Sequence, residues 1–185
     1  MFTENTFADV SKDDWYYDAV KYVYENNLMQ GTDKGFEADS KMTRAMLVTV
    51  LYRLENPSEE IGECIFEDVS ENAWYGDAVA WAAENDIVSG ISETEFAPED
   101  NVSREQMAMI FYRYAKFKGY NTEETSELSQ FTDKAKISDW SLEALKWANA
   151  AEIISGTSDT EISPKDTATR GQVASILMRF CERIK

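Results

Sequence analysis

Three arginines at the predicted starts of helices carry the most informative chemistry in this chain. Arg44, Arg104 and Arg170 each follow a threonine or a serine, residue types that cap helix N-termini, so each arginine is expected at the first helical position. A cation there faces the positive end of the helix dipole, which is unfavourable by about a few tenths of a kcal/mol. Because this unfavourable placement recurs three times, it indicates that the arginines have a function other than stabilising the helices. A guanidinium beside free backbone N–H groups forms a clamp for a carboxylate or a phosphate.

The alternative interpretation of these arginines is structural. Each could form an ion pair with an acid of another segment, such as Asp9, Asp68 or Asp133. If the clamp is correct, replacing an arginine by alanine should weaken ligand binding by about 1.5–3 kcal/mol, the range for a charge-assisted hydrogen bond. Folding should be unchanged or slightly improved, because the conflict with the helix dipole disappears.

Three tryptophans, Trp15, Trp74 and Trp140, precede the expected first helices. Two roles are open for them. They could fill the core of a helical bundle, or they could present an exposed ring face on which the C–H face of a sugar stacks. Beside an arginine clamp, the second role predicts a carbohydrate site.

Catalysis and metal binding find no support in the sequence. There is no histidine, and Cys64 and Cys181 are the only two cysteines, in no metal-ligand spacing. A disulfide between them is one interpretation, and two mostly buried thiols are the form that we expect. Nothing resembles a P-loop, a nucleophile elbow, an EF-hand loop or a pair of glycosidase carboxylates. The sequence therefore predicts no catalytic residue, no metal and no cofactor.

The elements that must position the arginines and tryptophans occur in three copies. Each copy opens with Phe-x-Asp, continues with the tryptophan and a glycine sixteen residues after it, and then reaches the Thr-Arg or Ser-Arg pair. The glycines are Gly31, Gly90 and Gly156. So many matches at fixed offsets indicate a triplication, with copy 1 at residues 2–58, copy 2 at 59–128 and copy 3 at 129–185.

Each copy is predicted to form a helix, a loop and a second helix. The first helix should run from about the tryptophan to just before the glycine, which would end it in a left-handed cap. The second helix should begin after Thr43, Ser103 or Thr169 and carry a buried apolar stripe. Because two helices cannot bury their apolar faces alone, the copies should pack together. We expect an all-α, pseudo-threefold spindle with a central three-helix bundle of the second helices and the first helices outside.

The composition narrows the classes of partner. Apolar residues make up 43% of the chain, and 18 Lys and Arg stand against 35 Asp and Glu, for a net charge of −17. Such a surface disfavours nucleic acid and anionic lipid, and no apolar run is long enough for membrane insertion. The N-terminal residues lack the features of a signal peptide, so we expect either a cytoplasmic protein or a piece of an exported chain whose signal lies elsewhere.

The combined pattern resembles the S-layer homology domain. Phe-x-Asp-Val, Trp-x-x-x-Ala, a Gly-Thr loop and Thr-Arg at a helix start recur over residues 2–184. The resemblance implies a monomeric spindle of three such domains that anchors bacterial exoproteins at the cell surface. It also implies that the partner is an anionic, often pyruvylated, secondary cell-wall polymer linked to peptidoglycan. A module that recognises another exoprotein is the alternative, and an enzyme is disfavoured.

By position, the resemblance implies ligand-binding residues in grooves between adjacent domains. They are Arg44, Arg104, Arg170, Trp15, Trp74, Trp140, Asp9, Asp68, Asp133, Gly31, Thr32, Gly156 and Thr157.

Departures from the family pattern predict a ranking of these grooves. Copy 2 has Ile91 after the glycine in place of the threonine hydroxyl, and residues 59–128 hold 4 basic and 17 acidic side chains. An anionic glycan near this copy would meet a repulsive field. We therefore expect the Arg44 and Arg170 helix starts to carry most of the affinity and Arg104 to contribute least.

Overall fold

The computed structural model describes residues 2–70 and 72–184, and this part of the chain folds into α-helices with no strand. The α-helices are α1 (Tyr17–Glu25), α2 (Arg44–Glu55), α3 (Gly76–Glu84), α4 (Arg104–Phe117), α5 (Leu142–Ala150) and α6 (Arg170–Arg183). Two short 3-10 turns, Lys134–Lys136 and Asp139–Ser141, precede α5. The predicted all-α class is confirmed.

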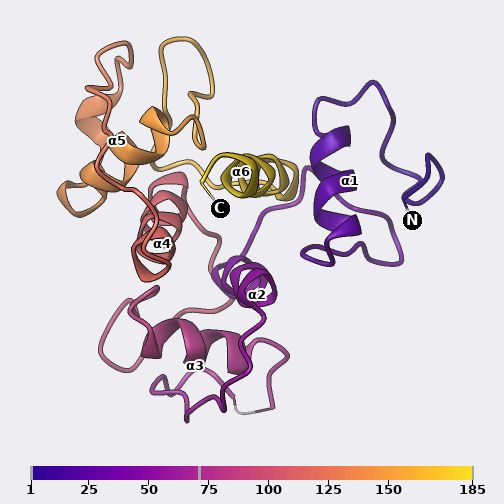
Figure 1. The fold of residues 1–185 in the computed structure, drawn as a ribbon, viewed down its shortest axis with the longest axis vertical. Helices are drawn as coiled ribbons and strands as arrows, with labels where there is room; N and C mark the ends of the chain where they lie inside the picture. The colour runs from indigo at the N-terminus through magenta and orange to yellow at the C-terminus, as the bar shows by residue number, and fades with distance from the viewer. Residues whose placement is uncertain (1, 71, 185) are drawn as a thin grey trace.

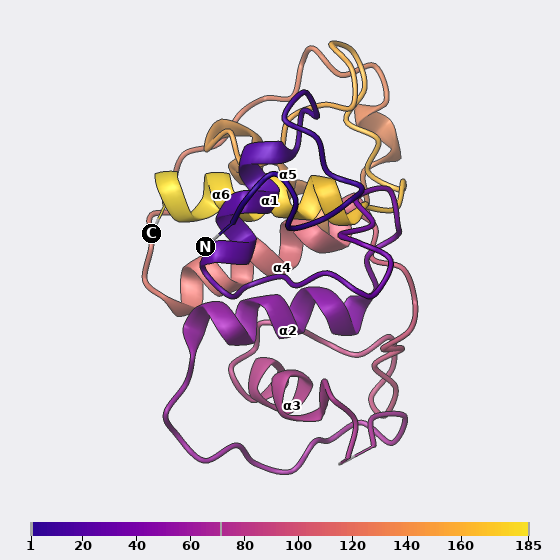
Figure 2. The same ribbon diagram turned by 90° about the vertical axis from the view of Figure 1, so that its right-hand side faces the viewer.

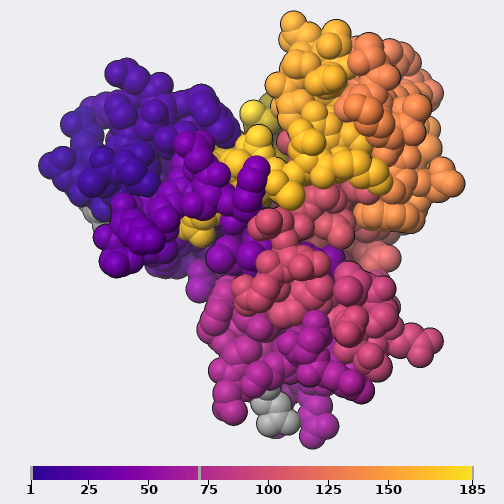
Figure 3. Space-filling model, turned by 180° about the vertical axis from the view of Figure 1, so that it is seen from behind, coloured from indigo at the N-terminus to yellow at the C-terminus, as the bar shows by residue number. Residues whose placement is uncertain are grey.

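The second helices of the three copies lie in the middle of the molecule, and the first helices lie outside them. Figure 1 shows α2, α4 and α6 around the centre with α1, α3 and α5 on their outer sides, and the turned view in Figure 2 agrees. From behind, the space-filling surface divides into three lobes in the colours of the three copies (Figure 3). The symmetry of the predicted spindle stays a prediction.

Each first helix packs against the second helix of a different copy. Helix α3 packs on α2, α5 packs on α4, and α1 packs on α6. The last of these pairs brings the N-terminal copy onto the C-terminal one. The apolar side of α1, with Val20 and Val23 fully buried, is therefore covered by a helix that follows it by about 150 residues of sequence, counted from the helix bounds.

A closed ring of backbone hydrogen bonds joins the three copies just before the second helices begin. The N–H of Met42 donates to the carbonyl of Ala168 at 3.0 Å, the N–H of Ala168 donates to Val102 at 3.1 Å, and the N–H of Val102 donates to Met42 at 2.9 Å. Because each copy contributes one donor and one acceptor, the ring is complete only when all three copies are present.

The second helices form as the sequence predicts. Thr43, Ser103 and Thr169 cap them, each accepting a hydrogen bond from the backbone N–H of the third helical residue, and the three arginines occupy the first helical position. The predicted stripe is buried in all three helices, with Leu54 at its edge partly buried. The stripe consists of Leu47, Val50, Leu51, Leu54, Met107, Ile110, Phe111, Tyr114, Val173, Ile176, Leu177 and Phe180.

The first helices are shorter than predicted, and their glycines are not caps. Each of these helices has nine residues and ends several residues before the glycine. The left-handed residues after them are Asn27, Asp86 and Glu152. The glycine is required for a different reason, which is close packing: a Cβ on Gly31 would lie 2.2 Å from the ring of Phe7. Spacing alone could not separate a cap from a close approach made by a side chain distant in sequence.

One buried ionic network joins copies 2 and 3. Glu105, which is 4% exposed, accepts hydrogen bonds from the N–H and hydroxyl of Ser138, from the hydroxyl of Ser141 and, at 2.6 Å, from the ammonium of Lys165. Burial alone would raise the pKa of Glu105, but these hydrogen bonds outweigh it and hold the pKa below its ordinary value. The ionised carboxylate is therefore the form that stabilises the fold.

We expect Glu105→Gln to lower the free energy of unfolding at neutral pH by about 1–3 kcal/mol, because an amide cannot accept all four donors. A depressed folded pKa gives stability that is present above the unfolded value of about 4.3 and is lost as the pH falls through the folded pKa. The parent should thus lose more stability than the variant between about pH 5 and pH 3. Urea titrations across this range measure the difference. Glu124→Gln, at an exposed glutamate, is the control, and parallel pH profiles would contradict the assignment.

Candidate ligand-binding grooves

Three corresponding grooves lie where the copies meet, and we name each after the arginine at its rim. The Arg44 groove, of about 430 Å³, is lined by Arg44, residues 88–91, Gln106, Met109, Ile110, Arg113 and Trp140. The Arg104 groove, of about 300 Å³, is lined by Arg104, residues 155–157, Gln172, Ser175, Ile176, Arg179 and Trp15. The Arg170 groove, of about 180 Å³, is lined by Arg170, Met29, Gln30, Met42, Met46, Thr49, Val50, Arg53 and Trp74.

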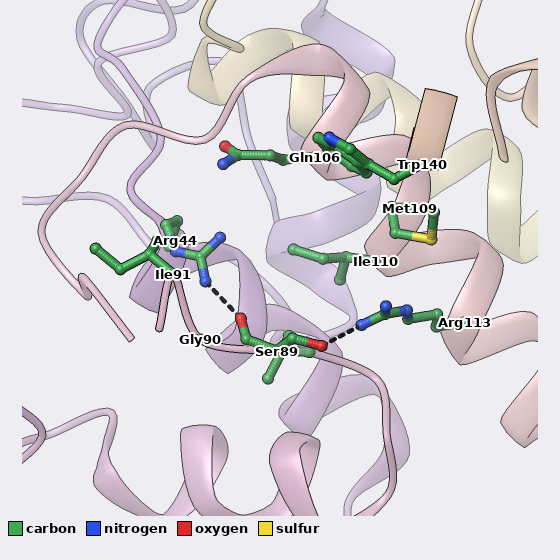
Figure 4. Close-up of a pocket in the computed structure, with 10 residues that line it drawn as sticks. Arg44, Ser89, Gly90, Ile91, Gln106, Met109, Ile110, Arg113 and Trp140 are labelled. Carbon is green, nitrogen blue, oxygen red and sulfur yellow. Dashed lines mark hydrogen bonds between the residues drawn. The ribbon is translucent and has the colours of Figure 1, made fainter. Parts of the chain in front are cut away.

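Each groove draws on all three copies. In the Arg44 groove the arginine comes from copy 1, the loop and helix α4 from copy 2, and the tryptophan from copy 3 (Figure 4). In each of the other two grooves, the arginine, the loop with its second helix, and the tryptophan likewise come from three different copies. The structure therefore brings the predicted arginines and tryptophans together, although no arginine shares a groove with the tryptophan of its own copy.

The three arginines fasten the copies to one another. Arg44 donates from Nε to the carbonyl of Phe96 and from Nη2 to that of Ser89, both at 2.9 Å. Arg104 and Arg170 make the same pair of bonds to the loops that follow them around the ring, ending on Ile162 and Ser155 and on Phe36 and Gln30. The predicted alternative, an ion pair with Asp9, Asp68 or Asp133, is not formed within residues 2–70 and 72–184.

The prediction of free N–H groups at the second helix starts is wrong. The backbone N–H of Arg44 donates to the carbonyl of Asp100 at 2.9 Å, and that of Ala45 donates to Pro98 at 3.0 Å. Equivalent bonds occupy the first two N–H groups of α4 and α6. The loop of the next copy thus satisfies the helix end, so the backbone cannot also bind an anion there.

The arginines nevertheless keep a donor for a ligand. Nε and Nη2 are used in each guanidinium, whereas Nη1 has no hydrogen-bond partner among the described residues. No side-chain nitrogen in this part of the chain is both fully buried and unpartnered, so solvent reaches each Nη1. Burial lowers the pKa of Arg44, and Asp100 and Asp68 oppose this change. Because a guanidinium stays protonated in proteins, the groove keeps its positive charge.

A second arginine in each groove escaped the sequence prediction. Arg53, Arg113 and Arg179 stand nine residues after the first arginine of the same helix, a repeated spacing that could have revealed them. The Nη1 of Arg113 donates to the hydroxyl of Ser89 at 2.7 Å (Figure 4). Of the three second arginines, Arg53 is exposed, and Arg113 and Arg179 are partly buried. Because the second helix of one copy faces the first arginine of another, the two arginines of one groove never belong to the same helix.

The tryptophans are exposed, and the prediction that they could fill the core is wrong. Trp15, Trp74 and Trp140 are 66%, 62% and 52% exposed, whereas Trp81 and Trp147 are buried. Trp15 and Trp74 each contact the tyrosine that follows them edge to face, at 5.2 and 5.1 Å between ring centroids. That contact holds the ring while leaving a face open at the groove.

The predicted aspartates lie outside the groove linings. Asp9, Asp68 and Asp133 each accept two backbone N–H bonds from the loop of their own copy, at 2.7–3.0 Å. Their carboxylates are therefore used in shaping the loop that receives the arginine.

The predicted loop residues divide between the grooves. Gly156 and Thr157 line the Arg104 groove, where the Thr157 hydroxyl lies 2.7 Å from that of Ser163. Gly31 and Thr32 lie outside the lining of the Arg170 groove, and the Thr32 hydroxyl donates to Glu37. The structure thus brings only one of the two Gly-Thr pairs to a groove.

The expected ranking of the grooves rested on a wrong assignment of the loops. Ile91 lines the Arg44 groove and not the Arg104 groove, because each arginine docks on the loop of the following copy. The Arg104 groove receives Gly156-Thr157 from copy 3, where residues 129–185 hold 8 basic and 8 acidic side chains. The observations that ranked Arg104 last therefore apply to the Arg44 groove.

The charge of the grooves is opposite to that of the chain. Each lining contains two arginines and none of the 35 aspartates and glutamates, in a protein with a net charge of −17. Two guanidiniums in a concave site without a competing carboxylate form a local anion site. Within the described residues no cluster of three or more metal-ligating side chains exists, and none of the helices is long and apolar enough to cross a membrane.

Several known proteins are similar in sequence to this chain, some of them over nearly its whole length. A model of the S-layer homology domain matches residues 6–45, 65–108 and 130–174. The chain is 31% identical to an amylopullulanase of Thermoanaerobacterium thermosulfurigenes over 97% of its own length and 10% of that protein's. It is 31% identical to a surface-layer 125 kDa protein of Lysinibacillus sphaericus over 90% of its length and 14% of that protein's. A cellulosome-anchoring protein of Acetivibrio thermocellus is 30% identical over 48% of the chain and 20% of its own.

Proposed function

This chain belongs to the S-layer homology domain family, and we propose that it holds an anionic cell-wall glycan in its three grooves. The family consists of non-catalytic anchoring modules, so the chain is an anchor at the bacterial cell surface and not an enzyme. It spans between about a tenth and a fifth of the length of the curated relatives that it matches across most of its sequence. What it anchors therefore lies in other parts of such proteins.

The observation that carries the proposal is the pairing of arginines in an otherwise acidic molecule. A neutral glycan would need no such concentration of positive charge, and an acidic surface elsewhere would repel polyanions that do not fit the grooves. The anion that fits is a carboxylate on a sugar ring, such as the ketal-linked pyruvate that the family resemblance implies. A monomeric module offers all three grooves to the wall at once, which raises avidity without new contacts.

Three groups in each groove would contact the sugar. In the Arg44 groove, Arg44 and Arg113 lie on either side of Ile110, and Trp140 lies above them in the view of Figure 4. A carboxylate between the two guanidiniums gains charge-assisted hydrogen bonds, while the C–H face of its ring packs on the indole. The same groups in the other two grooves are Arg104, Arg179 and Trp15, and Arg170, Arg53 and Trp74.

Sedimentation with purified bacterial walls tests this function. The triple variant Arg53→Ala, Arg113→Ala and Arg179→Ala should stay folded, because these side chains are partly or largely exposed, and should bind walls at least about tenfold more weakly. The triple variant Lys21→Ala, Lys34→Ala and Lys41→Ala, at exposed lysines outside the grooves, changes the net charge equally and should bind like the parent.

Two results would count against a glycan. If binding survives chemical removal of the wall polysaccharide but not protease treatment of the walls, the module recognises a protein. If both triple variants bind equally weakly, net charge and not the grooves determines binding.

A further inference from the structure

The Arg44 groove does not end at Arg113. A second hollow of about 460 Å³ adjoins it and shares Ser89 and Arg113 with it. Its remaining lining consists of Asn85, Asp86, Lys116 and Phe117. The two hollows therefore adjoin along α4, and Arg113, hydrogen-bonded to the Ser89 hydroxyl at 2.7 Å, forms the boundary between them. We call the two hollows together the depression along α4.

Phe117 gives this second hollow a fixed aromatic surface. The ring is 40% exposed, and it is held from behind by Trp81, edge to face at 6.0 Å and 88°, and by Tyr114 at 6.3 Å. An aromatic ring that neighbours hold in place loses little side-chain entropy on binding, so it suits stacking against the C–H face of a sugar. Beside it, Lys116 lies over the ring of Tyr112 at 4.3 Å and adds a cation to Arg113.

The other two copies lack this surface for local reasons. In copy 1 the helix ends at Glu55 and is capped by Asn56, which has the left-handed φ of 50°, and Pro57 stands where copy 2 has Phe117. In copy 3 the corresponding residue is Arg183, which forms an ion pair with Glu152. The aromatic surface is thus particular to α4, the second helix of copy 2.

Acidic side chains limit how far an anionic ligand could extend. Beyond Phe117 lies a third hollow that shares Asn85 and Phe117 with the second. Its lining includes four glutamates, Glu55, Glu59, Glu60 and Glu84. The second hollow itself holds two cations, Arg113 and Lys116, against one carboxylate, Asp86. A polyanion that follows α4 from the Arg44 groove therefore meets net positive charge as far as Lys116 and repulsion after Phe117.

We propose that the depression along α4 is an extended binding site, in which the Arg44 groove holds one unit of the glycan and the Phe117 hollow holds the adjoining unit. The second ring stacks on Phe117, and its polar groups face Arg113 and Lys116. This inference rests on the proposed function of the grooves. It adds that the Arg44 groove, alone among the three grooves, binds an oligosaccharide more tightly than a single unit. The gain in affinity ends after the second unit.

Calorimetric titration with sized glycan fragments tests the extended site. The probes are acidic fragments of one, two and three repeating units, released from walls with which the module sediments. The protein carries Arg53→Ala and Arg179→Ala, which weaken the Arg170 and Arg104 grooves and leave the Arg44 groove as the main site. We expect the two-unit fragment to bind about three- to tenfold more tightly than the single unit, in line with one aromatic contact. The three-unit fragment should bind no more tightly than the two-unit fragment.

Substitutions at Phe117 distinguish this site from the groove itself. Phe117→Ala should remove the gain from the second unit and leave the single-unit affinity unchanged, whereas Phe117→Trp should keep the gain. Lys116→Gln, at an exposed side chain, should reduce the gain. A gain that survives Phe117→Ala, or an equal loss of affinity for all fragments, would overturn the extended site while the proposed function stands. If no fragment of any length binds, the proposed function fails and the extended site with it.

Discussion

Replacing Arg104 by alanine is expected to lower the free energy of unfolding by about 2–4 kcal/mol, because two charge-assisted hydrogen bonds between copies are lost and two carbonyls are left unpaired. The side chain is 4% exposed, and it donates to Ile162 at 2.9 Å and to Ser155 at 2.6 Å. The helix-dipole argument expected no loss or a slight gain from the same substitution. The hydrogen bonds outweigh the dipole, since that term amounts to only about a few tenths of a kcal/mol.

Chemical denaturation of the three arginine-to-alanine variants measures the loss of unfolding free energy in each and ranks the three losses. Arg44→Ala should cost about as much as Arg104→Ala, because Arg44 is 6% exposed, and Arg170→Ala should cost less, because its Nη2 bond is exposed. Arg179→Ala, in the same groove as Arg104, is the matched control. Its one bond, to Ser155 at 3.4 Å, is long, so stability should change by no more than about 0.5–1 kcal/mol. An Arg104→Ala protein as stable as the Arg179→Ala protein would show that the bonds between copies contribute little.

Arg44, Arg104 and Arg170 each join two copies and also line a groove. If Arg44→Ala, Arg104→Ala or Arg170→Ala binds a ligand more weakly, the loss has two causes. The ligand loses a contact, and the packing between two copies is weakened. The second arginines give the cleaner measure, because Arg53, Arg113 and Arg179 line the grooves but form their hydrogen bonds within their own copies.

Deleting copy 3, residues 129–185, is expected to abolish cooperative folding of the remainder. Helix α1 would lose α6, and its fully buried Val20 and Val23 would be exposed to water. Met42 would lose its acceptor on Ala168, and Arg104 would lose both of its carbonyls. These losses exceed the marginal stability of a typical domain, about 5–15 kcal/mol, once the α4–α5 packing is removed as well.

Circular dichroism and thermal melts of residues 1–128 check this expectation. Addition of a separate 129–185 chain should restore helicity, because the contacts between the copies are not covalent. A 1–128 fragment that melts cooperatively without its partner would show that two copies suffice, and the closed ring would then be a product of folding and not its requirement.

The sequence by itself determined the local features of this protein. The triplication, the six helices, the caps at Thr43, Ser103 and Thr169 and the buried stripes follow from spacing within short windows, where neighbouring residues decide the outcome. The family, and with it the absence of catalysis, came from the same repeated motifs. The predicted arginines and tryptophans line the same grooves in the structure, and both recur at fixed offsets in every copy.

Only the tertiary structure decided which copy each groove residue contacts. Arg44 reaches a carbonyl at Ser89, 45 residues away, and Arg170 reaches Gln30 across 140 residues. No local pattern encodes such a partner, because three similar copies offer three similar loops and only the closed packing of α1 on α6 selects among them. The same packing placed Ile91 in the Arg44 groove and provided carbonyl acceptors for the N–H groups at the helix starts. It also brought Arg53, Arg113 and Arg179 into grooves with the first arginine of another copy. A repeat fixes its own geometry by short-range interactions, whereas the contents of a site between repeats depend on how the chain closes.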